Sequence, residues 1–245
     1  MSSGLFSALP WDSGFFGFPT ARILPAALDE AGLRVALETM AKVDTQLAYW
    51  NVAPEDAVSN RAAATCGGFL ADVKTTYAIE PPVSDSNRIR CTVAPVAGGV
   101  GTPALYALSE EAGKYSRFRV DPEFPPALFR ALYVEWMRKS LSGEKADAVL
   151  SANEGGTPFG MVTVQAKDGL GAIGLVSVAP GHQGRGFGTS LIQSALRWFS
   201  DRGCRKVEVV TQEKNAEACR LYERNGFRLA EKVNVWHFRP KAFSQ

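Results

Sequence analysis

The stretch that most constrains the fold is residues 174–189, which reads GLVSVAPGHQGRGFGT. An apolar β-strand pattern over residues 175–178 leads through a Pro-Gly turn and a glycine-rich loop into residues with helical apolar spacing. The first backbone N–H groups of a helix lack internal partners, and the helix dipole adds partial positive charge there. This stretch therefore predicts a strand, a loop and a helix N-terminus that binds a phosphate, with room provided by Gly184, Gly186 and Gly188.

The spacing of these glycines limits which phosphate ligand fits. The dinucleotide fingerprint G-x-G-x-x-G is absent, and so is the P-loop Lys followed by Ser or Thr. What remains is Q-x-x-G-x-G, from Gln183 to Gly188, directly after the predicted strand. The pattern alone leaves open a second interpretation, a close-packed turn without a ligand.

The remaining sequence predicts an α/β protein in two parts. With 245 residues, 46% of them hydrophobic and 21% charged, the chain can build one large or two modest globular domains. Residues 1–82 predict a small α/β domain of order β-α-β-α-β, and residues 83–87 form a polar linker. Residues 88–245 predict a second domain of order β-α-α-β-β-β-α-β-α-β.

Composition argues against several classes of protein. The net charge of +2, without a basic stripe, argues against nucleic-acid binding. The four cysteines are widely spaced and form no C-x-x-C, which argues against a metal site or a disulfide framework. No apolar run approaches the roughly 18 residues of a membrane span, and the opening residues do not read as a secretory leader. We therefore expect a cytoplasmic protein without metal and without a membrane partner.

Two motifs in sequence order resemble the GCN5-related N-acetyltransferases, the GNAT family. The first is the Q-x-x-G-x-G loop, and the second is N-x-x-A-x-x-x-Y-x-x-x-G-F, from Asn215 to Phe227. The resemblance covers about residues 88–240, which is an entire domain. It implies the GNAT fold, a mixed central sheet splayed between strands 4 and 5. It also implies an acyltransferase that uses acetyl-CoA as co-substrate.

The resemblance assigns roles to individual residues. Tyr222 matches the position whose phenol protonates the departing CoA sulfur, a role that suits a group with a pKa of roughly 10. The alternative for Tyr222 is a core aromatic packed on Phe227. Backbone N–H groups of the predicted strand would bond the pantetheine arm and polarise the thioester carbonyl, the loop would grip the pyrophosphate, and the Asn215 amide would bond the pantetheine. The implied CoA-binding residues are Val176, Ser177, Val178, Gln183, Gly184, Arg185, Gly186, Phe187, Gly188, Thr189 and Asn215.

The general base that deprotonates the acceptor amine is left open. No residue type and spacing singles out one group, and a water chain to solvent is a further alternative. The candidates are His182, His237, Asp121, Glu123 and Glu208.

A narrower resemblance, to the TDP-fucosamine acetyltransferases, concerns the acceptor. It rests mainly on W-D-x-x-F-F-G at 11–17, S-R-F-R at 116–119 and Y-x-x-W at 133–136. It implies a nucleotide-linked 4-amino-4,6-dideoxy sugar and a part in cell-surface polysaccharide biosynthesis. Arg117 and Arg119 offer forked donors for a diphosphate, with Asp121 beside them, but they could equally pair with nearby carboxylates to fix a helix end.

Other functions and an internal repeat stay open. The acceptor could be another small amine, an antibiotic or a protein N-terminus, or the chain could be a non-catalytic acyl-CoA-binding regulator. A homodimer is also left open. Residues 60–73 echo residues 218–233, which indicates that residues 1–82 are a degenerate partial GNAT repeat without a CoA site, unless the similarity is due to chance. The aromatic stretch 11–18 is predicted to be a buried entry loop.

Overall fold

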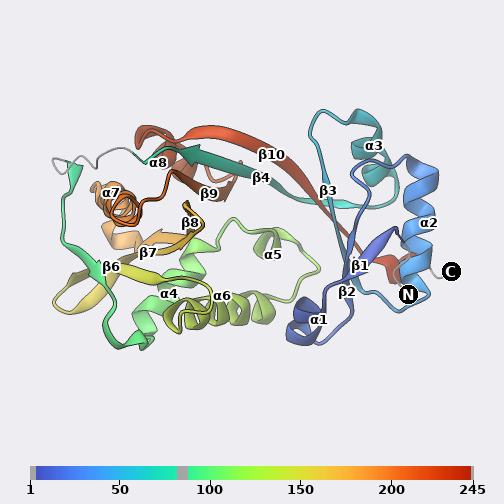
Figure 1. The fold of residues 1–245 in the computed structure, drawn as a ribbon. Helices are drawn as coiled ribbons and strands as arrows, with labels where there is room; N and C mark the ends of the chain where they lie inside the picture. Colours follow the sequence, from blue (N-terminus) through green and yellow to red (C-terminus); the bar gives the residue numbers. More distant parts are fainter. Residues whose placement is uncertain (1–3, 82–87, 244–245) are drawn as a thin grey trace. The chain divides into compact units, whose positions relative to one another are not determined.

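The computed structural model describes residues 4–81 and 88–243, and these residues form two compact units. Unit 1 consists of Met1–Lys74 with Lys232–Gln245, and unit 2 of Thr75–Glu231. The division differs from the predicted boundary because two long strands, β4 (Phe69–Ile79) and β10 (Arg228–Phe238), each contribute residues to both units (Figure 1). The predicted linker, residues 83–87, lies outside the described residues.

In unit 1 a small sheet packs against the helices of residues 30–41 and 57–65. Antiparallel pairing joins β1 to β2 and β3 to β10, whereas β2 and β3 run parallel. Apolar side chains of the helices pack against Trp50 and Phe238 in a buried core. The predicted strands and helices of residues 20–79 are confirmed. The elements are β1 (Phe6–Ala8), α1 (Pro10–Phe16), β2 (Thr20–Ile23), α2 (Glu30–Ala41), β3 (Leu47–Val52), α3 (Ala57–Thr65) and a final 3-10 turn, Pro240–Phe243.

Two features of unit 1 differ from the predictions. The short strand β1 has too few residues to show an alternating pattern and was not predicted. The stretch predicted as a buried entry loop is instead helix α1, which begins at a proline and ends at Gly17 in the left-handed region, φ 78°. Phe16 is buried there, but Trp11 is 41% exposed, so burial of the aromatic stretch is only partial.

Unit 2 is a mixed sheet with helices on both faces (Figure 1). Its strand order is β4-β9-β8-β7-β6-β5. The pairs from β5 to β8 are antiparallel, whereas β8 and β9 run parallel. The chain order confirms the predicted succession and adds a one-turn helix, α5. The elements are β5 (Val93–Pro95), a 3-10 turn (Ala97–Gly99), α4 (Pro103–Ala112), α5 (Arg117–Val120), α6 (Pro126–Leu141), β6 (Ala148–Glu154), β7 (Thr157–Lys167), β8 (Leu170–Val178), a 3-10 turn (Pro180–His182), α7 (Phe187–Ser200), β9 (Lys206–Gln212) and α8 (Ala216–Arg224).

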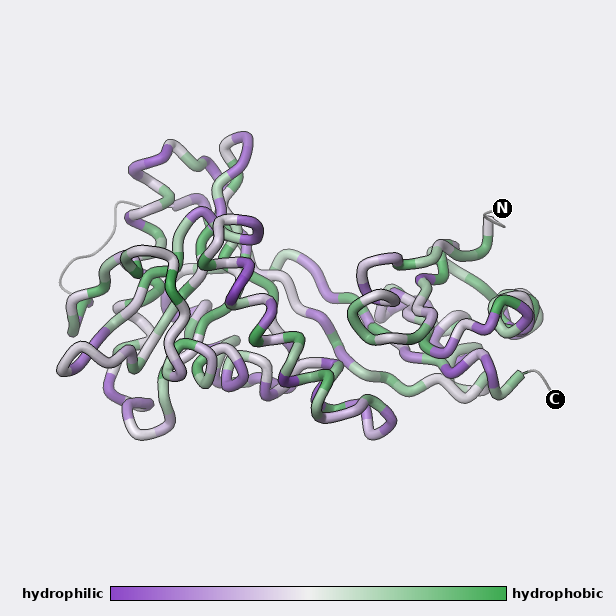
Figure 2. Tube along the Cα trace, turned by 90° about the horizontal axis from the view of Figure 1, so that it is seen from below, coloured by the Kyte–Doolittle hydropathy of each residue, from purple (hydrophilic) through white to green (hydrophobic). Residues whose placement is uncertain are grey.

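The two faces of this sheet hold separate cores because neighbouring strand residues point in opposite directions. On β6, Val149 packs with residues of α4 and α6, whereas Leu150 belongs to the larger core beneath α7 and α8. Helix α7 contributes apolar residues at helical spacing, among them Leu191, Leu196 and Phe199. In Figure 2 hydrophobic and hydrophilic stretches alternate along the trace of this unit, as expected of helices and strands with one buried face.

Strands β8 and β9 separate partway along their length, as the fold prediction requires. They pair in parallel only where residues 170–173 lie beside residues 206–209. At this point β8 carries a β-bulge, because Thr163 of β7 stands opposite both Gly174 and Leu175. The Leu175 N–H donates to Thr163 Oγ1 at 2.8 Å. Beyond the bulge, the last residues of β8 are free to line a gap in the sheet.

Candidate active site

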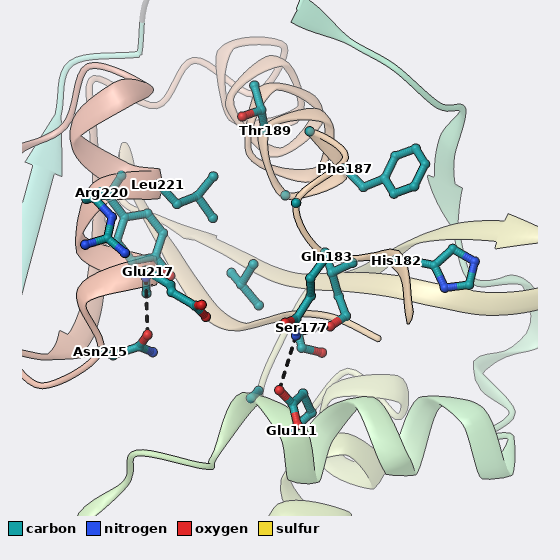
Figure 3. Close-up of a pocket in the computed structure, with 18 of the residues that line it drawn as sticks. Glu111, Ser177, His182, Gln183, Phe187, Thr189, Asn215, Glu217, Arg220 and Leu221 are labelled. Carbon is teal, nitrogen blue, oxygen red and sulfur yellow. Dashed lines mark hydrogen bonds between the residues drawn. The ribbon is translucent and has the colours of Figure 1, made fainter. Parts of the chain in front are cut away.

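A cavity of about 440 Å³ lies where β8 leaves β9 (Figure 3). Its walls come from four elements of unit 2: the end of β8, the glycine-rich loop with the start of α7, helix α8, and the last turn of α4. The predicted CoA-binding residues that line it are Val176, Ser177, Val178, Gln183, Gly184, Gly186, Phe187, Gly188, Thr189 and Asn215, together with the predicted acid Tyr222.

The wall of the cavity formed by the end of β8, residues 176–178, offers backbone groups rather than polar side chains. The Ser177 hydroxyl is buried and donates to the Leu108 carbonyl oxygen at 2.7 Å, which ties β8 to helix α4. The carbonyl oxygen of Val178 already accepts from Gln183 Nε2 at 2.9 Å. The strand can therefore offer a ligand its remaining backbone N–H groups in a wall of otherwise apolar character, which suits an extended chain such as pantetheine.

The start of α7 is built to receive an anion. Gly184 and Gly186 both adopt the left-handed region, with φ of 75° and 83°, which L side chains rarely adopt. Gly186 is the N-cap of α7 and supplies no side chain, and the first intrahelical bond runs from the Ser190 N–H to the Gly186 carbonyl oxygen at 3.2 Å. The three N–H groups before Ser190 therefore point out of the helix end without an intrahelical partner.

The glycine at position 188 has a packing role. A Cβ there would lie 3.3 Å from Leu221 Cδ2, so α7 and α8 approach closely at the cavity. Arg185, also predicted to contact CoA, is not among the lining residues, and its guanidinium lies 5.0 Å from the centre of the Phe187 ring.

Asn215 has a structural task as well as a place in the cavity wall. Its Oδ1 accepts from the Ala218 N–H at 3.2 Å, which caps helix α8 (Figure 3). Because Oδ1 is used in the cap, the amide N–H groups are the part of this side chain that can donate to a ligand.

Tyr222 lies in the cavity wall and is 4% exposed. Its ring centroid is 5.8 Å from that of Phe227 and 6.0 Å from that of Tyr77. The structure is therefore compatible with both interpretations of Tyr222, as an acid and as a core aromatic, because the ring packs in the core while the residue borders the cavity. Burial raises the pKa of the Tyr222 phenol above its ordinary value, which keeps the phenol protonated.

Tyr77, on β4, was not predicted as a site residue. Its hydroxyl donates to Glu223 Oε1 at 2.9 Å, which fixes the ring beside Tyr222. Burial is the main cause that raises its pKa as well. A tyrosine in a strand more than 140 residues earlier carries no local signal for this contact.

The end of α4 and the segment just after it add charged residues that the sequence motifs did not identify. Lys114 Nζ lies 2.9 Å from Glu111 Oε1 and 3.7 Å from Glu217 Oε2 of α8. Gln183 Nε2 also donates to Glu111 Oε1, at 3.3 Å (Figure 3). The hydrogen bond to Glu111 raises the pKa of Lys114, so the lysine carries its charge between two carboxylates.

The predicted acceptor residues on α5 lie outside the cavity wall. The Arg117 guanidinium lies 4.6 Å from the centre of the Phe118 ring, and that of Arg119 lies 5.5 Å from the centre of the Phe129 ring. Asp121 is buried, and its Oδ1 accepts from the Glu123 N–H at 3.0 Å. None of the three is among the residues that line the cavity.

The candidate bases differ in their surroundings. His182 borders the cavity, but its ring stacks on Phe159 at 4.5 Å and its Nε2 lies 3.2 Å from Glu154 Oε2. Glu208 pairs with a neighbouring lysine, and His237 is buried in unit 1. These surroundings single out no base.

Residues 4–81 and 88–243 contain no group of three or more His, Cys, Asp or Glu side chains placed to hold a metal ion. In the same ranges no helix is both long and apolar enough to cross a membrane.

Comparison with known proteins agrees with the fold. The model of the acetyltransferase (GNAT) family matches residues 103–227. The dTDP-fucosamine acetyltransferase of Escherichia coli O6:H1 is 29% identical over 236 residues, which are 94% of this chain and 96% of that protein. The spore coat polysaccharide biosynthesis protein SpsD of Bacillus subtilis is 27% identical over 57% of this chain and 48% of its own length. A GCN5-related N-acetyltransferase from Sphaerobacter thermophilus shares the fold, with a TM-score of 0.64 and 19% identity over 96% of this chain and 76% of that one.

Proposed function

Because this chain belongs to the acetyltransferase (GNAT) family and is an acyltransferase, we propose that it moves an acetyl group from acetyl-CoA to the amine of a nucleotide-linked amino-dideoxy sugar. The observation that carries the proposal is the similarity to the dTDP-fucosamine acetyltransferase of Escherichia coli, which extends over 94% of this chain. The similarity to a spore coat polysaccharide protein supports a part in cell-surface polysaccharide biosynthesis.

The cavity suits acetyl-CoA as co-substrate. The N-terminal N–H groups of α7 would receive the pyrophosphate, since left-handed glycines open the loop there and no side chain caps the helix. The pantetheine arm would follow the backbone of residues 176–178, with the Asn215 amide donating to it. This arrangement brings the thioester toward the gap between β8 and β9, where freed backbone N–H groups can stabilise an oxyanion.

The reaction we propose is direct transfer without an acyl-enzyme. The neutral acceptor amine attacks the thioester carbon, so that a C–N bond forms and the carbonyl oxygen takes negative charge. When the C–S bond breaks, Tyr222 gives its proton to the sulfur, and the amine proton leaves to water or a base. Burial that keeps the Tyr222 phenol protonated supports the role of acid.

The acceptor would be held by residues of the α5 segment. Arg117 and Arg119 can offer forked N–H donors to a nucleotide diphosphate, and Asp121 helps fix the backbone that follows them.

A CoA-thiol release assay against a panel of acceptors tests the proposal. The panel holds TDP- and UDP-linked 3-amino and 4-amino dideoxy sugars, an aminoglycoside, a polyamine and a peptide. Turnover confined to a TDP-linked 4-amino sugar is the expected result. Turnover only with the cationic amines would contradict the acceptor and leave the co-substrate in place. Binding of acetyl-CoA without any turnover would point to a regulator.

A further inference from the structure

We propose that Arg90, Arg220 and Arg224 form a site for the 3′-phosphate of coenzyme A, so that the protein distinguishes CoA from 3′-dephospho-CoA. This inference rests on the proposed function. It concerns a second anionic group of the co-substrate, separate from the pyrophosphate on the α7 N-terminus. Arg90 lies outside residues 103–227, the part of the chain that the family model matches.

Three contacts place Arg90 beside the glycine-rich loop and near the end of α8; Arg90 itself is not among the residues that line the cavity. The Arg90 N–H donates to Ser190 Oγ at 2.8 Å, and the Arg90 side chain runs so close to the loop that a Cβ on Gly186 would lie 3.5 Å from its Cγ. Arg220 and Arg224 stand one turn apart on α8, and both line the cavity. Arg88 Nη2 donates to the Arg224 carbonyl oxygen at 2.9 Å, which ties the Arg90 segment to the end of α8.

These arginines carry charge that nearby carboxylates do not neutralise. Among the described residues, no Asp or Glu forms an ion pair with Arg90, Arg220 or Arg224. Glu217, the acidic neighbour of Arg220 on α8 (Figure 3), lies 3.7 Å from Lys114 Nζ instead. The loop end of the cavity therefore has an excess of positive charge.

The other positive features of the cavity are already used. Lys114 is shared between two carboxylates, and the N-terminus of α8 is capped by Asn215. The N-terminus of α7 is open, but it is the place for the pyrophosphate. A 3′-phosphate, which sits on the ribose directly attached to that pyrophosphate, must therefore be met by side chains at the same end. The guanidinium fork fits a phosphate with paired N–H donors.

Calorimetric titration with CoA and with 3′-dephospho-CoA tests the site directly. We expect the wild-type protein to bind CoA about tenfold more tightly, because charge-assisted hydrogen bonds at an exposed rim contribute modestly. In Arg90→Gln, Arg220→Gln and Arg224→Gln, and most clearly in the triple variant, this ratio should fall toward one while the affinity for 3′-dephospho-CoA stays unchanged. Arg197→Gln, an exposed arginine in the last turn of α7, removes the same charge and should keep the ratio.

Each other outcome contradicts the inference in a different way. Equal affinities in the wild-type protein, or an unchanged ratio in the triple variant, would overturn the 3′-phosphate site and leave the proposed function standing. A triple variant that keeps the ratio of the CoA and 3′-dephospho-CoA affinities but raises the KM for the acceptor would show that the arginines bind the acceptor instead. Absence of binding to either ligand would overturn the proposed function together with the site.

Discussion

The hydroxyl of Thr163 accepts a hydrogen bond from the backbone N–H of Leu175 at 2.8 Å, across the bulge that turns β8 away from β9. Gly174 makes this contact possible, because a Cβ at that position would lie 2.6 Å from Thr163 Oγ1. One hydroxyl on β7 thus satisfies a backbone donor that the bulge removes from the ladder. The cavity exists because β8 leaves its partner at this point.

We expect Thr163→Val to destabilise the protein by about 1–3 kcal/mol, because the change leaves the Leu175 N–H without its acceptor inside the sheet. The KM for acetyl-CoA should rise in parallel if the bulge positions the β8 wall. Chemical denaturation and steady-state kinetics measure the two effects. Thr157→Val, an exposed threonine at the start of the same strand, is the matched control and should alter neither quantity. A Thr163→Val protein with wild-type stability and KM would show that the hydroxyl does not support the bulge.

The loop glycine at the start of α7 gives a second prediction. Gly186→Ala should cost ~1–2 kcal/mol of stability, because an L residue is strained at φ 83°. It should also weaken CoA binding, since relief of that strain moves the first N–H groups of the helix. Thermal denaturation measures the stability, and calorimetric titration measures the affinity for CoA. Gly181→Ala is the control for both, because Gly181 lies in the same loop but has neither a left-handed φ nor a close neighbour. Equal behaviour of the two variants would contradict the role of the loop conformation.

The two roles of Asn215 can be separated by the choice of replacement. Asn215→Ala removes the helix cap and the amide donors, so it should lose about 1 kcal/mol of stability and also raise the KM for acetyl-CoA. Asn215→Asp keeps a capping oxygen but removes the amide N–H groups. It should therefore keep near-wild-type stability and still raise the KM. If the Asp variant matched the wild type in both respects, Asn215 would act only as a cap.

The buried phenol of Tyr222 makes stability depend on alkaline pH. Burial raises its pKa in the folded protein, whereas in the unfolded chain the phenol ionises near its ordinary value of about 10. The contribution is thus fully present below about pH 10 and is lost as the pH rises further. Urea midpoints measured between neutral pH and pH 11 should fall more steeply for the wild type than for Tyr222→Phe. Parallel curves would mean that the phenol is not protected from ionisation.

Local sequence patterns were enough to predict the fold around the cavity. The strand, loop and helix from residue 174 onward and the capped helix that carries Tyr222 are each specified by neighbours within a few residues: glycines that allow positive φ, an N-cap asparagine and helical apolar spacing. Short elements such as β1 and α5 escaped prediction, because three or four residues hold too little periodicity.

The rest of the site depends on contacts between distant segments. Thr163 meets Leu175 only through strand register, and Glu111 reaches the loop only because α4 packs against β8. Tyr77 meets Tyr222 only through the arrangement of the strands and helices of unit 2. Such pairings leave no mark in local spacing, so a single sequence could not reveal them. The fixed positions of Arg117 and Arg119 against aromatic rings are of the same kind.

We propose that acetyl transfer takes place in this cavity with Tyr222 as the acid. The most direct measurement compares Tyr222→Phe with the wild type in two quantities, kcat with the TDP-linked 4-amino sugar and the Kd of acetyl-CoA. We predict that kcat falls by roughly 100-fold or more, since a positioned acid contributes at least that factor, while Kd changes little. An unchanged kcat would contradict the role of Tyr222. A loss of acetyl-CoA affinity in proportion to the loss of kcat would show that the residue only supports the cavity.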